Sequence, residues 1–230
     1  MTPLLTEVLP DDGYAGVLVG RVWVGGALAG PRTVVVREEG VFDLSRLAPT
    51  LSDLFELDDP AEQVRVWRGD RIGDVDALVE ASFARGGGFL APCDLQALKA
   101  AGVTFADSLI ERVIEERAKG DPAAAAAIRK TLTAAIGVDL AAVKPGSPQA
   151  MEVKALLMRE GLWSQYLEVG IGPDAEVFTK AQPMSAVGLG AQVGLHPKSV
   201  WNNPEPEIVL ACASTGRVVG AALGNDVNLR

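Results

Sequence analysis

The chain has 230 residues, of which 48% are hydrophobic and 22% charged, a composition typical of a globular protein with a sizeable core rather than a disordered chain. Its formal net charge of −9 argues against nucleic acid or an anionic membrane as the main partner. No apolar run approaches the length of a membrane span, and the first residues lack the pattern of a signal peptide. The two cysteines, Cys93 and Cys212, form no zinc-binding pattern, so we expect a cytoplasmic protein with free thiols.

The first third of the chain is predicted to be rich in β-structure. Runs of β-favouring residues alternate with glycine over residues 14–36, which predicts short strands joined in hairpins. Short helices are predicted at 50–57 and 72–83. Three glycines at 86–88 then interrupt the chain. We take them as the boundary between an N-terminal β-rich region, residues 1–88, and a second domain, residues 89–230.

The middle of the chain is predicted to be helical. Apolar residues at 109, 110, 113 and 114 fall on one face of a helix. Asp121 and Pro122 start a second, alanine-rich helix that extends to about Ile136. A third helix is predicted at 151–160, and from Trp163 onward we expect β-structure again.

Two apolar runs near the end of the sequence, Ile208–Ala213 and Val218–Leu223, are predicted to pair as a hairpin. A two-residue loop at Thr215-Gly216 fixes their register. Continued outward, that register places residue 205 opposite residue 226.

Three carboxylates meet at the outer end of this predicted hairpin. Glu205 lies opposite Asp226, and Glu207 shares the face of Glu205 because side chains alternate along a strand. Their repulsion can be offset by protonation, a basic side chain or a divalent cation, and three carboxylates suit a hard cation such as Mg²⁺. An ordinary solvated face is the alternative, and a slip of one residue would separate the carboxylates. Pro206 cannot donate a ladder hydrogen bond, so an edge strand is expected here.

A second candidate site begins at Ser108. The spacing of Ser108 and Glu111 is that of a helix capping box, in which both residues have a purely structural role. Alternatively, Glu111 is a general base at the start of a helix in a cleft. Lys180 either binds an anionic substrate or is a surface lysine. His196, the only histidine, precedes a proline and is interpreted as structural.

Four segments, taken in order, resemble the fumarylacetoacetate hydrolase family: GVTFADSLIE, EVFTKAQPMSAVG, PEPEIVL and GNDVNLR. The resemblance runs from about Leu90 to Arg230. It implies an α+β, β-rich fold, in which a small N-terminal β/α region precedes the first part of a mixed β-barrel or roll. In that family an E-x-E motif and a following Asp bind a divalent cation, usually Mg²⁺, and Mn²⁺ or Ca²⁺ are further candidates. The corresponding residues here are Glu205, Glu207 and Asp226.

The family's hydrolases carry a His-Glu pair where this chain has Ser108 and Glu111, which weakens the case for hydrolytic C–C cleavage. The segments are more similar to the family's 2-keto-3-deoxy sugar-acid dehydratases. The resemblance therefore implies a Mg²⁺-dependent removal of water from a 2-keto-3-deoxy-pentonate to give an oxo-semialdehyde. Glu111 would remove a proton from C3, with Ser108 and Thr104 hydrogen-bonded near it. Thr104, Lys180 and Ser185 would contact the 2-oxo acid.

Two other functions stay open. One is a metal-dependent C–C hydrolase or decarboxylase of an acylpyruvate-like diketo acid, and the other is a non-catalytic chain that binds a cation or a partner. Members of the family continue beyond the N-D-V-x-x-R motif, so we expect this chain to be truncated at its C-terminus. Exposed strand edges would then favour a homo-oligomer.

Overall fold

The computed structural model describes residues 5–84, 87–102, 111, 113–114, 117–136, 143–163, 165–174, 176–200 and 202–229. The chain divides into two compact units, one formed by Met1–Ala97 together with Ala181–Arg230 and the other by Leu98–Lys180. Helices and antiparallel strands occur together, which agrees with the predicted α+β class. Within the described stretches, no helix is long and apolar enough to span a bilayer.

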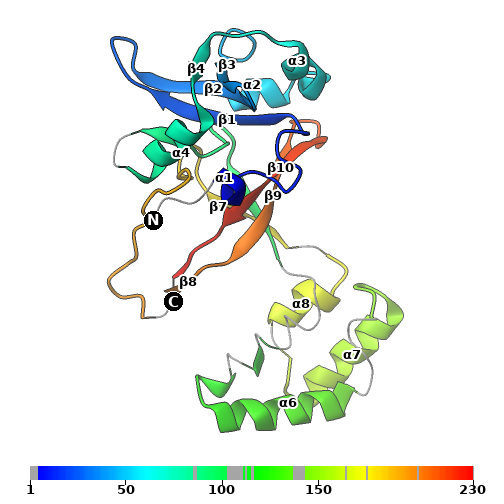
Figure 1. Cartoon of the computed structure of the whole chain (residues 1–230). Helices are drawn as coiled ribbons and strands as arrows, with labels where there is room; N and C mark the ends of the chain where they lie inside the picture. Colours follow the sequence, from blue (N-terminus) through cyan, green and yellow to red (C-terminus); the bar gives the residue numbers. More distant parts are fainter. Residues whose placement is uncertain are drawn as a thin grey trace. The chain divides into compact units, whose positions relative to one another are not determined.

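A five-stranded sheet forms the framework of the first unit (Figure 1). Its order is β4-β3-β2-β1-β5, and neighbouring strands pair antiparallel. The strands are β1 (Leu18–Val24), β2 (Gly30–Arg37), β3 (Gly40–Asp43), β4 (Arg71–Gly73) and β5 (Gly88–Leu90). The pairing of β1 with β2 confirms the hairpin predicted at 14–36.

Short helices cover this sheet: α1 (Leu5–Val8), α2 (Leu51–Phe55), α3 (Pro60–Val66) and α4 (Val75–Phe83). α2 confirms the helix predicted at 50–57, and Thr50 caps it by accepting a hydrogen bond from the Asp53 N–H. The helix predicted at 72–83 begins later than expected, because its first residues form β4. Leu44, Leu51 and Leu54 are fully or almost fully buried in the core under α2.

The predicted C-terminal hairpin is present as β9 (Pro206–Cys212) and β10 (Val218–Asn225). It forms a two-stranded sheet, and a further short pair, β8 (Asn202–Asn203) and β11 (Asn228–Leu229), lies beyond its outer end. Partly buried Ala211 and Val219 pack against the core under α2. At the turn, the Ser214 N–H and Oγ donate to the Glu56 carboxylate at 2.7 and 2.8 Å. These contacts hold the hairpin against the N-terminal part of the first unit.

The second unit contains α6 (Pro122–Ile136), α7 (Pro148–Arg159) and α8 (Gln165–Ile171), together with the paired strands β6 (Leu98–Ala101) and β7 (Val177–Ala181). α6 and α7 confirm two predicted helices. The β-structure expected directly after Trp163 was wrong, because α8 occupies residues 165–171. Leu167 and Ile171 stand four residues apart on one helix face and are both buried in the helical core. β-structure begins only at Val177.

The two compact units follow a different division from the predicted boundary at 88–89. Gly88 lies inside β5 and pairs with Trp23 of β1, so it is part of the framework sheet. The domains 1–88 and 89–230 and the barrel of the resembled family stay predictions.

Candidate metal centre

Three carboxylates come together where β9 begins and β10 ends. One oxygen from each of Glu205, Glu207 and Asp226 lies within 4.8 Å of the others. Glu205 and Asp226 are partly buried, whereas Glu207 is exposed. The Asp226 N–H donates to the Glu205 carbonyl oxygen at 2.9 Å, so the two residues face each other as predicted. The predicted convergence of the three side chains is therefore confirmed, and the binding of a cation stays a prediction.

The register that produces this convergence is the predicted one, but the turn is not. Gly224 pairs with Glu207, and this register continues to the pairing of Gly220 with Ala211. The Gly216 N–H then donates to the Ala213 carbonyl and the Ala213 N–H to Arg217, which closes a three-residue rather than a two-residue loop. An irregularity between Val218 and Gly220 offsets the extra loop residue.

Asn225 ties the two arms of the hairpin together at the carboxylates. Its side-chain Oδ1 accepts a hydrogen bond from the Glu205 N–H at 2.9 Å. The backbone of Glu205 is thus held through its N–H by Asn225 and through its carbonyl by Asp226. Sequence reasoning missed this role of Asn225, although the residue directly precedes a predicted ligand.

Gly224 keeps the carboxylate face open beside Glu207. Paired residues share one face of a sheet, so a side chain at position 224 would lie on the face of the carboxylates. A Cβ built there would stand 2.6 Å from Val209 Cγ2, well inside van der Waals contact. Glycine therefore leaves space that any other residue would fill.

The geometry of the three carboxylates fits a hard divalent cation. Such ions bind oxygen at roughly 2.0 to 2.6 Å, so two ligands on opposite sides of one ion are about 4 to 5 Å apart. Oxygens that lie within 4.8 Å of one another meet this condition with little movement of the side chains. A cation would also offset the repulsion among three negative charges.

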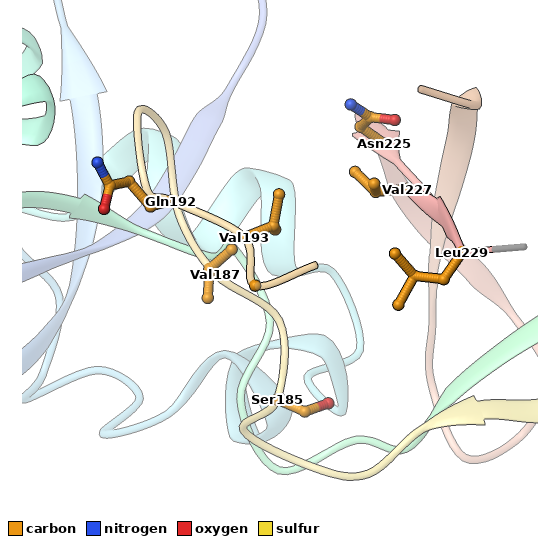
Figure 2. A pocket seen from close by; sticks show the side chains of 8 residues that line it. Ser185, Val187, Gln192, Val193, Asn225, Val227 and Leu229 are labelled. Atoms are coloured by element: carbon orange, nitrogen blue, oxygen red, sulfur yellow. The ribbon is translucent and has the colours of Figure 1, made fainter. Parts of the chain in front are cut away.

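A pocket of about 310 Å³ lies beside the outer end of the hairpin (Figure 2). Its lining consists of Ser185, Val187, Gln192, Val193, Gly194, Asn225, Val227 and Leu229. Figure 2 shows Asn225, Val227 and Leu229 along one arm and Val187 and Val193 on the facing loop. Because alternate residues of an extended chain point to opposite faces, this pocket lies on the side of the arm away from Asp226.

The other predicted site residues are distributed between the two units. Ser185 lines the pocket, and its hydroxyl donates to the Gln182 carbonyl at 2.5 Å. Lys180 is exposed in β7. Thr104 and Ser108 lie outside the described residues.

Glu111 makes a bidentate ion pair with Arg129, whose Nε and Nη2 lie 3.1 and 2.5 Å from its two carboxylate oxygens. Both side chains are about half exposed, at 51% and 49%. The hydrogen bond and the charge of Glu111 raise the pKa of Arg129. The two guanidinium contacts use one lone pair of each carboxylate oxygen, so the second lone pair of each oxygen is left to accept a proton.

Two curated proteins are similar to part of the chain. A 2-dehydro-3-deoxy-D-arabinonate dehydratase of Saccharolobus solfataricus is 36% identical over 55 residues, which cover 24% of this chain and 18% of that protein. A probable 2-keto-3-deoxyxylonate dehydratase of Haloferax volcanii is 38% identical over 65 residues, which cover 28% of this chain and 22% of that protein. No protein-family model matches the chain. No solved structure matches it significantly.

Part of the chain is thus similar to 2-keto-3-deoxy-pentonate dehydratases, and the similar segments span about a fifth of the length of each relative.

Proposed function

We propose that the chain belongs to a lyase that removes water from a 2-keto-3-deoxy sugar acid, with a divalent cation held by Glu205, Glu207 and Asp226. The observation that carries the proposal is the convergence of these three carboxylates on one face of the C-terminal hairpin. The names of the two partial relatives support the dehydratase chemistry. We propose Mg²⁺ as the ion, with Mn²⁺ or Ca²⁺ as alternatives, because all three prefer oxygen ligands.

A hard cation at this position would supply Lewis-acid stabilisation of the negative charge that develops when a proton leaves the carbon next to a keto group. The three carboxylates would hold the ion and leave positions on its open side for oxygens of a small 2-oxo acid. Asn225 would keep Glu205 in place through the hydrogen bond to its N–H.

The remaining roles concern proton transfer and substrate binding. Glu111 is the proposed base for C3, and its contact with Arg129 suggests that the substrate carboxylate could compete for the same guanidinium group. Ser108 and Thr104 are proposed to hydrogen-bond near this base. Lys180 and Ser185 are proposed to contact the anionic and hydroxylated parts of the substrate.

A calorimetric titration of Mg²⁺ into the chain, with and without pyruvate as a small 2-oxo acid, tests the metal centre. Saturable binding that is lost in Glu205→Gln supports it, since the variant removes one negative charge without changing the size of the side chain. The exposed Glu62→Gln is the matched control, because Glu62 lies on α3 and forms an ion pair with its helix neighbour Arg65. Equal binding by wild type and Glu205→Gln would refute the assignment of the ligands.

Product analysis then tests the reaction. A dehydratase converts a 2-keto-3-deoxy-pentonate into a single product that has lost one water, whereas a C–C hydrolase yields two fragments. Turnover that survives unchanged in Glu111→Gln would refute the proposed base. Cation binding without turnover would favour the non-catalytic alternative.

We also propose a homo-oligomer. The hairpin exposes apolar side chains on both strands, among them Ile208 at 73% and Leu223 at 88%. Exposed apolar side chains that lie together favour association, so a covering surface would stabilise the hairpin. Light scattering after size exclusion measures the mass directly, and a monomer over the accessible concentration range would refute this proposal.

A further inference from the structure

Among the described residues, two buried side-chain oxygens have no hydrogen-bond partner, and one of them is Oδ1 of Asn203. The group is an amide oxygen with two lone pairs. A buried acceptor left unpaired costs about 1–3 kcal/mol of stability, which makes such groups uncommon in native proteins. The orphaned oxygen of Asn203 therefore needs an explanation.

The orientation of the Asn203 amide follows from its neighbour. Its Nδ2 lies 3.5 Å from the Pro204 carbonyl oxygen, toward which it donates. The opposite orientation would bring two oxygens together at that place. Oδ1 is consequently the atom that points away from Pro204 and lacks a partner.

Asn203 shares the face of the carboxylates. It pairs with Asn228 in the same register in which Glu207 pairs with Gly224, four residues farther along each arm. An unchanged register means that side chains keep alternating, so Asn203, Glu205 and Glu207 lie on one face. Asp226 is the diagonal cross-strand neighbour of Asn203, at the separation of roughly 7–8 Å between backbone positions that longer side chains bridge.

We infer that Asn203 supplies a fourth, neutral oxygen to the cation site through its Oδ1. The inference rests on the proposed metal centre and adds to it a ligand outside the three carboxylates. A hard cation accepts amide oxygens as well as carboxylates. The ion would satisfy the orphaned acceptor without adding a fourth negative charge to the cluster.

The chemistry makes opposite predictions for the protein with and without the ion. Without a cation, Asn203→Leu removes an unsatisfied buried acceptor while keeping a side chain of similar size, so thermal stability should be unchanged or higher. With a cation, the same variant loses a ligand, and its affinity for Mg²⁺ should fall about 10- to 100-fold. If Asn203 had only a structural role, its replacement by Leu would lower the stability of the ion-free protein instead.

The experiment titrates Mg²⁺ into wild type, Asn203→Leu, Asn203→Asp and Asn202→Leu by calorimetry, and measures the thermal unfolding of each without the ion. Asn202 is the matched control, because it is the neighbouring asparagine on the opposite face and its Oδ1 already accepts from Ser199 Oγ at 2.6 Å. We expect the affinity to fall only in Asn203→Leu. Asn203→Asp should retain or increase the affinity while it lowers the stability of the ion-free protein, since it adds a fourth carboxylate.

Two results would overturn the inference, and they are distinguishable. If wild type binds Mg²⁺ and Asn203→Leu binds it equally well, Asn203 is not a ligand and the carboxylate site stands. If wild type itself binds no Mg²⁺, the proposed metal centre fails together with the inference. Should Asn203→Leu fold poorly, Asn203→Ser shortens the side chain beyond reach of the ion and replaces it in the same titration.

Discussion

Asp94 is predicted to stabilise the first unit more than any other single carboxylate described. Its side chain is 4% exposed. Oδ2 accepts from the Leu51 N–H at 2.8 Å, while Oδ1 accepts from the Ser52 N–H at 3.1 Å, the Ser52 hydroxyl at 2.5 Å and the Leu95 N–H at 2.8 Å. Arg21 stands 3.7 Å from Oδ2. The carboxylate thus connects β1, the start of α2 and its own segment.

The substitution Asp94→Asn keeps the shape of the side chain and removes the charge. Its amide group would turn two hydrogens toward backbone donors, and the buried guanidinium of Arg21 would lose its counter-ion. Removing one partner of a buried ion pair costs about 3–5 kcal/mol. Arg21 keeps hydrogen bonds to the carbonyls of Ala91 and Cys93, at 3.3 and 2.7 Å, so we expect a loss near the lower end, about 3 kcal/mol.

The loss should depend on pH in a defined direction. Burial acts to raise the pKa of Asp94, but hydrogen bonds from Ser52, Leu95 and Leu51 outweigh it and hold the pKa below the ordinary value of 3.8. A carboxyl group with a lowered pKa in the folded state contributes stability above the pKa of the unfolded chain. That contribution disappears as the pH falls through the folded-state pKa. The difference between wild type and Asp94→Asn should therefore be complete at neutral pH and shrink below about pH 4.

Urea unfolding followed by tryptophan fluorescence measures this effect. Trp163 and Trp201 are first replaced by Phe, which leaves Trp23 and Trp67 to report on the first unit. Asp53→Asn is the control, since Asp53 is an exposed carboxylate on the same helix. A loss below about 1 kcal/mol at neutral pH, or one that persists unchanged in acid, would refute the reasoning.

Two further predictions concern the hairpin. Glu56→Ala removes both acceptors of Ser214 at the turn, so hydrogen exchange of the β10 amides should accelerate several-fold; unchanged exchange would show that the turn does not depend on this contact. Gly224→Ala brings a Cβ within 2.6 Å of Val209 Cγ2, so the thermal midpoint should fall, and Val209→Ala should restore it in the double variant. A double variant as unstable as Gly224→Ala alone would mean that this contact is not the cause.

Local signals accounted for much of the fold. The strands and outer register of the C-terminal hairpin followed from two apolar runs around a Thr-Gly pair. Asp121 and Pro122 marked the start of α6 correctly, and the helix predicted at 50–57 is present as α2. α8 was missed because its sequence, QYLEVGI, is rich in residues that favour strands. Burial of Leu167 and Ile171 in the helical core outweighs that local preference.

Long-range contacts left no comparable local signal. Nothing in the run of glycines at 86–88 indicated that Gly88, which has a φ of +100°, packs so closely on α4 that a Cβ would lie 2.4 Å from Ser82 N. The absence of a side chain at Gly88 allows β5 to pack closely against α4. The buried pair of Arg21 and Asp94 joins positions far apart in the sequence, and no periodicity or spacing pointed to it.

Whether the three carboxylates share a face depends on the net shift in register between the two arms, not on the details of the turn. The predicted two-residue loop was wrong by one residue, and the irregularity at Val219 was not foreseen, yet the two shifts cancel. Because side chains alternate along a strand, only the net shift between Glu207 and Asp226 decides whether the two face the same side. The register is the same on both sides of residues 204–205 and 226–227, which belong to neither ladder, and it carries Asn203 onto the same face. One uncompensated residue anywhere between the arms would turn Asp226 away from both glutamates and remove the site.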